Sequence, residues 1–411
     1  MIIIIIVIIS LLVIGYLAYE LFLKPKGQEI LTTTISPNIR TFNPITITKL
    51  PILTQPQSKS QPQPQSKSQP QPQSQSQSQS QSQTQSQSQS QPQSKSPITP
   101  ASTYIPTTPL YPFTSHKFTN AGATGRLGPT LSQVKNAYSS ASWAQNNNFL
   151  NMANDNGIQL WTVPVTGNYT IQAVGGNAAQ FYTGIGQNGN RRGIDISTTT
   201  TLTKGEVIKI LVGQQGGIND SSQSGGGGGT FVVRSIQTPI IVAGGGGGSG
   251  GLLGSLGGYL SGPYSDASST TNGNGGIESL SGSTVTLLKN GGSDGSGGGG
   301  ASLIDENSGG GGLTGNGIKD AESVTPGLAF INGGLGGNTQ YYLSVGGFGG
   351  GGSARGGFGG AGGGGYSGGG GGNPIKSQYA AGGGGGSYAI NTMTINGYNS
   401  SGQGSVTITL Q

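Results

Sequence analysis

The chain has 411 residues, including 82 glycines and no cysteine, and its formal net charge is +6. The lack of cysteine excludes disulfide bonds and thiolate metal sites. Residues 20–119 carry eight of the 19 Lys and Arg residues and two of the 13 Asp and Glu residues, so the glycine-rich remainder is formally neutral. A neutral domain offers no broad basic face to phosphates, and we expect no nucleic-acid partner.

Residues 1–23 form an apolar stretch in which Glu20 is the first charged residue. At about 1.5 Å per residue, a helix of this length reaches roughly 35 Å and can cross a hydrocarbon core of about 30 Å. Lys24 and Lys26 follow it and would reach the interface. A cleaved signal peptide is disfavoured, because the stretch has no basic leader and no small-residue cleavage site. We therefore expect a single-pass transmembrane anchor.

Residues 24–110 are predicted to form a disordered stalk rich in Gln, Ser and Pro. The octapeptide Gln-Pro-Gln-Ser-Lys-Ser-Gln-Pro begins at Gln55, returns at Gln63 and degenerates into Gln-Ser alternation up to Gln91. Such a sequence has no apolar side chains to offset the entropy of ordering, so it favours an extended tether. A glutamine-driven aggregation or phase-separation role is the alternative, and the interspersed prolines argue against it.

Residues 111–411 form the predicted head, in which pure glycine runs alternate with short apolar segments. The longest runs are Gly225–Gly229, Gly244–Gly248, Gly368–Gly372 and Gly382–Gly386. The apolar segments Thr230–Val233 and Pro239–Ala243 are rich in β-branched residues and are predicted strands. Collagen is excluded because glycine does not recur at every third position. We expect the runs to wind as polyproline-II-like helices that bond to one another sideways, with flexible linker as the alternative.

Two further segments are predicted to form strands. Gln159–Ala173 alternates and predicts a half-buried strand pair, with a tight turn at Gly167–Asn168. The closing segment Gly404–Leu410 is also a predicted strand. Val207–Gln214 is another largely apolar segment of the head.

Together with Phe118–Thr130 and Gly365–Gly368, these segments resemble the glycine-rich domain of the anaplastic lymphoma kinase and leukocyte tyrosine kinase receptors, which also occurs in uncharacterised proteins of protists and large DNA viruses. The resemblance implies an all-β fold: a jelly-roll β-sandwich similar to tumour necrosis factor, with an inserted polyglycine helix bundle. Many relatives place a cysteine pair where this chain has Ala121 and Val134, and the paired loss fits a reducing compartment. No kinase motif follows, because His-Arg-Asp and Asp-Phe-Gly are absent.

The sequence suggests no catalytic, cofactor-binding or metal-binding residues. His116 is the only histidine and is expected to be an ordinary exposed side chain at the stalk boundary. Asp305 and Glu306 are neighbours in a polar stretch and are expected to be solvated rather than catalytic. Arg191 and Arg192 are neighbours in the sequence, so a local basic patch at this position stays an open alternative. Matches to dinucleotide fingerprints arise by chance in a chain so rich in glycine. We therefore expect no enzyme, no cofactor and no small-molecule substrate.

Asn168, Asn219 and Asn399 each begin an Asn-x-Ser/Thr sequon and are glycosylation candidates. In a chain so rich in Asn, Ser and Thr such matches also arise by chance, so the absence of a glycan stays open.

These patterns favour a membrane-anchored, non-enzymatic structural or adhesive display protein, for which a viral membrane or a virion is one setting. The partners expected are the membrane, through residues 1–23, and either a protein partner or further copies of the chain. The alternative is a binding module for a soluble protein ligand, as the receptor resemblance implies. The side of the membrane is open, because Lys24, Lys26 and Arg40 favour a cytosolic head whereas the resemblance favours an external one.

Overall fold

The computed structural model describes residues 108–153, 157–179, 191–218, 223–234, 238–250, 264–281, 284–301, 306–320, 322–340, 344–355, 359–373 and 380–411. The chain divides into two compact units, Met1–Ser96 and Pro97–Gln411, and the first contains no described residue. The predicted anchor and residues 24–107 of the predicted stalk therefore lie outside the described residues. Within the described ranges, no helix combines the length and apolar character needed to cross a membrane.

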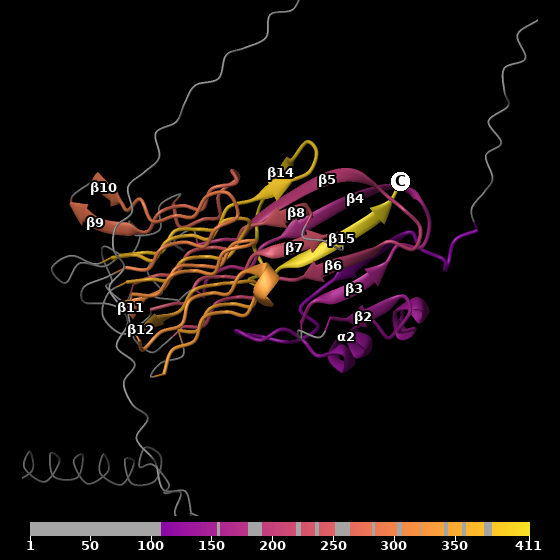
Figure 1. Ribbon diagram of the computed structural model, residues 1–411, viewed down its shortest axis with the longest axis horizontal. Helices are drawn as coiled ribbons and strands as arrows, with labels where there is room; N and C mark the ends of the chain where they lie inside the picture. Colours follow the sequence, from indigo (N-terminus) through magenta and orange to yellow (C-terminus); the bar gives the residue numbers. More distant parts are fainter. Residues whose placement is uncertain are drawn as a thin grey trace, which may run out of the picture. The chain divides into compact units, whose positions relative to one another are not determined.

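The described part of the second unit is an all-β protein built on two antiparallel sheets (Figure 1). In spatial order, the five-stranded sheet contains β1 (Ser115–Phe118), β15 (Ser405–Leu410), β4 (Gly167–Val174), β5 (Ile194–Leu202) and β14 (Thr394–Tyr398). The six-stranded sheet contains β13 (Tyr388–Ala389), β8 (Pro239–Ala243), β7 (Thr230–Val233), β6 (Val207–Leu211), β3 (Gln159–Thr162) and β2 (Leu150–Met152).

Smaller elements lie outside the two sheets. The helix α2 (Leu131–Ala137) begins at a capping box, in which the Thr130 hydroxyl accepts from the Gln133 amide and the Gln133 side chain accepts from Thr130. The remaining elements are η2 (Ser142–Gln145), η3 (Phe330–Asn332), the pair β9 (Ile277–Ser281) and β10 (Thr284–Leu287), and the pair β11 (Glu306–Asn307) and β12 (Ala354–Arg355).

The two sheets face each other across one hydrophobic core. Residues alternate along β5 between buried and more exposed positions, as expected of a strand with one face inward. Trp161 of β3 and Tyr169 of β4 meet edge to face at 5.9 Å between ring centroids, one from each sheet. Strands β6, β7 and β8 form a meander within one sheet, and β4 and β5 form a hairpin within the other. This two-sheet arrangement does not confirm the predicted jelly-roll connectivity.

Strand β7 is buried on both faces, which explains its unbroken apolar sequence. Val232 points into the core between the sheets, whereas Phe231 and Val233 belong to a second cluster with Phe330 and Phe348 of the glycine-rich region. The rings of Phe231 and Phe330 stack with centroids 5.1 Å apart. The six-stranded sheet is therefore covered by the other sheet on one face and by the glycine-rich region on the other.

Three predicted strands are confirmed. Thr230–Val233 and Pro239–Ala243 are β7 and β8 with the predicted bounds, and β15 lies within Gly404–Leu410. Strand β6 lies within Val207–Gln214, for which no strand was predicted from the sequence.

The strand pair predicted around Gly167–Asn168 is wrong. Both strands exist, but β3 pairs with β2 and β6, whereas β4 pairs with β15 and β5. Gly167 and Asn168 are the first residues of β4 rather than a turn. The chain crosses between the sheets at residues 163–166. Trp161 and Tyr169 pack into the same core from opposite sheets. A hairpin within one sheet would place both residues in that one sheet, so it would not produce this contact.

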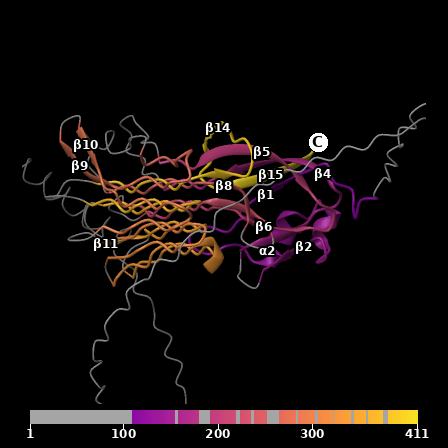
Figure 2. The ribbon, with the colours of Figure 1, turned by 45° about the horizontal axis from the view of Figure 1, so that its top comes forward.

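Beyond the strands, the glycine runs form a slab of extended segments that lie side by side (Figures 1 and 2). In the run 225–229, the first and fourth amides donate to the segment 214–217, the second and fifth to the segment 349–352, and the third to Gly246. Donors three residues apart thus bond to the same neighbour, which is the repeat of an extended helix with three residues per turn. Each run is tied to several others, so the linker alternative is wrong for these segments.

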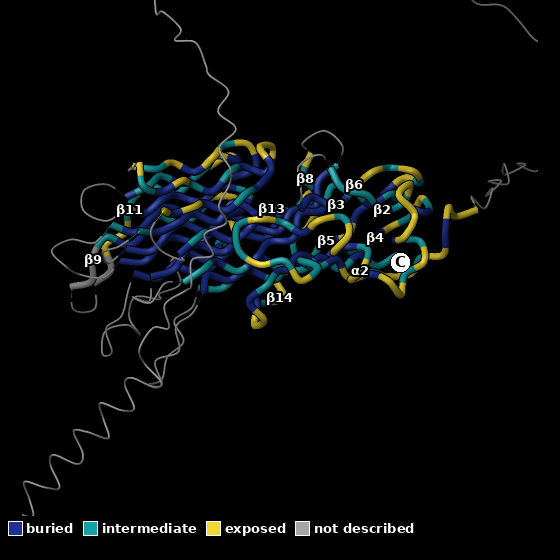
Figure 3. Tube along the Cα trace, turned by 90° about the horizontal axis from the view of Figure 1, so that it is seen from below, coloured by how far each residue is buried: buried dark blue, intermediate teal, exposed yellow. Residues whose placement is uncertain are grey.

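The slab is closely packed as well as hydrogen-bonded. Figure 3 shows most of its described segments as buried. A Cβ atom added at Gly298 would lie 2.0 Å from the carbonyl oxygen of Gly369, and one added at Gly246 would lie 2.0 Å from the carbonyl oxygen of Arg191. Backbones approach here to distances that leave no room for a side chain.

We predict that Gly298→Ala destabilises the head by about 2 kcal/mol or more, because the methyl group forces the neighbouring backbone away and disrupts its hydrogen bonds. The matched control is the adjacent Gly299→Ala, whose Cβ has its nearest neighbour at 3.1 Å, the Cβ of Asn290. We expect a clearly smaller loss for the control. Thermal and denaturant unfolding would measure both. Equal stability of the two variants would contradict the close packing of the slab.

Candidate functional site

His116 is not the exposed side chain expected from the sequence. It lies in β1 opposite Ile408 of β15, so its ring faces the core side of the sheet. The rings of Phe118, Tyr138 and Trp143 surround it edge to face, with centroids 4.6–5.0 Å away. The Nε2 atom is buried without a hydrogen-bond partner among the described residues. Burial lowers the pKa of His116 to about 4, because the charged imidazolium is poorly solvated there.

The three sequons lie in different settings. Asn168 is exposed on β4, and its Oδ1 accepts from the Thr201 hydroxyl at 2.7 Å. Asn219 lies outside the described residues. Asn399 is only 4% exposed, and its Nδ2 donates to the carbonyl oxygens of Gly175 and Gln403 at 2.7 and 2.9 Å. A glycan attached to that nitrogen would replace one of its two hydrogens, break at least one of these bonds and require space at a buried position, so Asn168 is the more accessible candidate of the two described.

Other residues singled out in the sequence are placed as follows. Ala121 and Val134 both pack into the core between the sheets, at the edge and in the interior respectively. Asp305 lies outside the described residues, and Glu306 in β11 pairs across the strands with Arg355 of β12. Within the described ranges, no group of three or more His, Cys, Asp or Glu residues is arranged to hold a metal ion.

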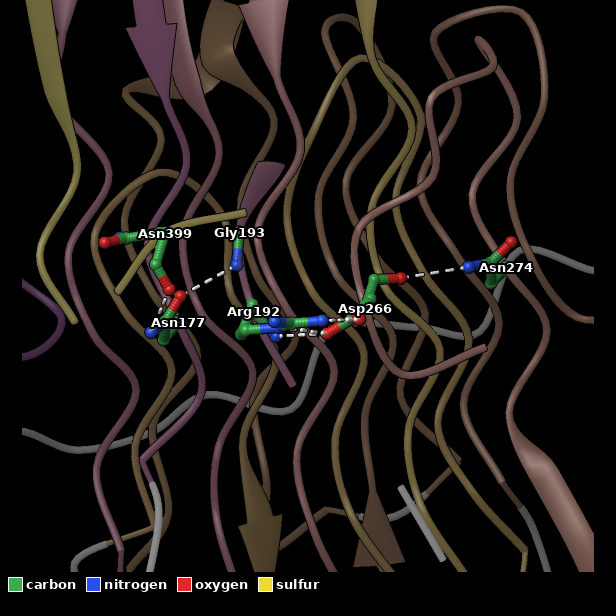
Figure 4. A network of polar contacts seen from close by, with 6 residues as sticks. All are labelled: Asn177, Arg192, Gly193, Asp266, Asn274 and Asn399. Carbon is green, nitrogen blue, oxygen red and sulfur yellow. Dashed lines mark hydrogen bonds and ion pairs between the residues drawn. The ribbon is translucent and has the colours of Figure 1, made fainter. Parts of the chain in front are cut away.

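Arg192 does not contribute to a basic patch, because it pairs with the buried carboxylate of Asp266 (Figure 4). Its Nη2 donates to Oδ2 at 2.9 Å, and its backbone amide donates to Oδ1 at 2.7 Å. The hydrogen bond to Asp266 raises the pKa of the Arg192 guanidinium. The guanidinium also lies 4.6 Å from the ring centroid of Tyr398 in β14. One side chain thus links the start of β5, the edge strand β14 and the glycine-rich segment around residue 266.

Two asparagines, the buried Asn177 and the half-buried Asn274, make further hydrogen bonds at the same junction (Figure 4). Asn177 accepts from the amide of Gly193 at 2.8 Å through Oδ1, and donates to the carbonyl oxygen of Asn399 at 3.2 Å through Nδ2. Asn274 donates to the backbone carbonyl of Asp266 at 3.0 Å. Polar side chains therefore satisfy backbone groups where strands of the five-stranded sheet give way to the slab, and they hold the two parts together.

The outer face of the five-stranded sheet is hollowed beside its edge strand. A hollow of about 430 Å³ opens beside β4, β5 and the start of β14. Its lining side chains bear hydroxyl or amide groups and no charge; they include Thr170, Ser197, Thr199, Asn391, Thr392 and Thr394. The Thr170 and Thr199 hydroxyls bond to each other at 3.0 Å across the two strands.

The hollow exists because β14 is shorter than its neighbour. It pairs with β5 only over Ile194–Ser197, and the preceding loop covers the rest of that edge. Asn391 donates through Nδ2 to the carbonyl oxygen of Thr199 at 2.9 Å, and the Thr198 hydroxyl donates to the carbonyl oxygen of Thr392 at 3.0 Å. Two hydrogen bonds thus fix the loop as the wall of the hollow.

Sequence reasoning named none of the residues of this hollow. The only local signal was the run Ser197–Thr201, a serine followed by four threonines. Thr198 and Thr200 are buried, whereas Thr199 and Thr201 are exposed. Because threonine serves on either face of a strand, the usual alternation of apolar and polar residues was hidden.

Comparison with known proteins shows a likeness that covers part of the chain. No family model matches the chain. The leukocyte tyrosine kinase receptor of Mus musculus is 39% identical to it over 102 residues, which is 24% of this chain and 11% of the receptor. The chain therefore contains a region related to part of a receptor and spans about a tenth of that protein's length. Membership of a glycine-rich domain family stays a prediction.

We predict that Asp266→Asn destabilises the head by about 2 kcal/mol, because the Arg192 guanidinium loses a charged acceptor at the junction. The double-mutant cycle with Arg192→Gln measures the coupling between the two side chains. The control is Glu322→Gln, which removes an exposed pair with Lys319 and is expected to change stability little. Additive effects of the two junction substitutions would contradict the link.

We also predict that stability falls as the pH drops from about 6.5 to 4. In this window the unfolded chain protonates His116, whose unfolded pKa is about 6.5, while the folded chain keeps it neutral. The expected contribution is about 2 kcal/mol, less than a fully buried ring would give. The His116→Phe variant keeps an aromatic ring and should flatten this part of the curve. Identical pH profiles for the two proteins in urea unfolding would contradict the prediction.

Proposed function

We propose that this chain is a membrane-anchored, non-enzymatic display protein. Residues 1–23 anchor the chain in the membrane, and residues 24–110 act as a tether. The head, residues 111–411, presents a recognition surface. The observation that carries the proposal is the slab, in which glycine backbones bond to one another with a repeat of three. Such a region offers backbone rigidity and very few reactive side chains. That composition suits a scaffold better than a catalyst.

The finer architecture is part of the same proposal. The repeat of three in the donors of the run 225–229 supports a bundle of polyglycine-II helices. The run 382–386 has the same repeat, since Gly382 and Gly385 donate to Gly248 and Gly245. We propose that this bundle is an insertion in a sandwich related to the jelly-roll folds, as the receptor resemblance implies.

A second candidate function is a binding module for a soluble protein ligand. It is favoured by the partial likeness to the mouse receptor, although that likeness covers a small part of either protein. The adhesive and receptor-like roles differ in their partner: further copies of the chain or a surface protein in the first, one soluble ligand in the second. A viral membrane or virion as the setting rests on the resemblance alone.

We predict that the full chain resists carbonate extraction from membranes, and that deletion of residues 1–23 releases it, because the apolar stretch is long enough to span. The control is deletion of residues 55–91, which shortens the stalk and should leave extraction unchanged. Recovery of the full chain in the soluble fraction would contradict the anchor.

Two binding measurements distinguish the candidate functions: self-association of the chain as its concentration rises, and saturable binding of a soluble protein. Sedimentation of the anchor-deleted chain should show self-association if the role is structural, whereas saturable capture of one soluble protein indicates the receptor-like role. In either case the 55–91 deletion should reduce contact between opposed membranes, because a shorter tether lowers the effective concentration of the head at the opposite surface. The affinity of the head for its partner in solution should not change, because the binding surface is the same. Turnover of a substrate by the purified chain would contradict both functions.

A further inference from the structure

We propose that the hollow on the outer face of the five-stranded sheet binds a neutral glycan. The inference deepens the display function proposed above by assigning one site and one class of ligand to the head. It rests on the side chains of β4, β5 and β14 and on the loop that precedes β14.

The first support is the regular pattern of polar side chains around the hollow. Strand register places Ser115, Thr409, Thr170 and Thr199 in one row across four neighbouring strands. The next row across the sheet contains Thr407, Gln172, Ser197 and Thr394, with Lys117 at its end. Neighbouring strands lie about 4.8 Å apart, so hydroxyl and amide groups repeat at that spacing over the face.

The second support is the size and construction of the hollow. Its volume of about 430 Å³ lies within the range of small-ligand sites, roughly 300–1,000 Å³. One side is the pair Thr170 and Thr199 on the sheet, and the opposite side is the loop held by Asn391. Because both sides are fixed by hydrogen bonds, the site is formed before a ligand arrives, which lowers the entropic cost of binding.

The third support is the charge of the lining. The described side chains that line the hollow carry no positive charge to attract a phosphate or a carboxylate. The nearby Asp195 is not part of the lining, and its carboxylate accepts from the neutral amides of Gln172 at 2.8 and 2.9 Å and of Asn396 at 3.0 Å. The lining itself is therefore polar and uncharged, and the charge beside it is negative, which disfavours an anionic ligand.

Hydroxyl groups can donate one hydrogen bond and accept two, and an amide side chain can do both. Within the lining, the Thr170 and Thr199 hydroxyls satisfy each other in part, and Asn391 donates through Nδ2 to the carbonyl oxygen of Thr199, which leaves its Oδ1 as an acceptor. A sugar hydroxyl is likewise a donor and an acceptor, so a neutral glycan matches every group on the surface. A lipid chain would leave these polar groups unpaired, which is costly.

The test uses the full chain in nanodiscs and three probes: neutral hexasaccharides of glucose, mannose and N-acetylglucosamine. Titration calorimetry should show saturable binding of at least one probe, with a dissociation constant below about 1 mM. The Thr170→Val and Thr199→Val double variant removes two hydroxyls at nearly constant shape. It should weaken binding by about tenfold or more. Thr394→Phe, which fills the hollow from the edge strand, should abolish binding.

The matched control is the double variant Thr201→Val and Thr203→Val, which removes two exposed hydroxyls at the end of β5, outside the lining and outside the two polar rows. It should bind like the wild type. Lack of binding by all three probes, or equal losses in the two double variants, would overturn the site. Tighter binding of a heparin hexasaccharide than of the neutral probes would overturn the ligand class. Carbonate extraction is independent of these substitutions, so failure of the glycan site leaves the display function standing.

Discussion

The head depends on hydrogen bonds between glycine backbones that lie too close together for any side chain. An extended helix with three residues per turn directs its amides and carbonyls outward, so no bond forms within a segment. Each segment needs neighbours on several sides before its polar groups are satisfied. Because an added Cβ at Gly298 or Gly246 would lie 2.0 Å from a carbonyl oxygen, glycine is the residue that permits this packing. Within the slab, hydrogen bonds among neighbouring segments take the place that packed side chains have in the core between the two sheets.

Such a slab still needs a conventional fold to begin and end its segments. The six-stranded sheet provides this, since strand β7 contributes Val232 to the core between the sheets and Phe231 to the contact with the slab. The Arg192–Asp266 pair joins the other sheet to the slab through one buried carboxylate. Sheet and slab are therefore parts of one packed unit, and Arg192 also contacts the edge strand β14 through the ring of Tyr398.

This rigidity bears on the proposed display role. The hollow on the outer face is walled by a loop that two hydrogen bonds attach to β5, and β5 begins at the Arg192 junction. The proposed recognition surface would thus be built on strands and on a loop fixed to them, which favours precise presentation of polar groups.

The sequence by itself determined the local elements: β7 and β8 followed from β-branched runs between glycines, and the need for lateral bonding followed from glycine runs too long for a turn. Only the tertiary structure decided how the elements pair. Strands β3 and β4 were predicted as a hairpin but belong to different sheets, because pairing depends on distant strands such as β6 and β15. The burial of His116 and the hollow beside Thr199 have the same origin: β15 and the loop before β14 lie far away in the chain, and local patterns carry no information about contacts of that range.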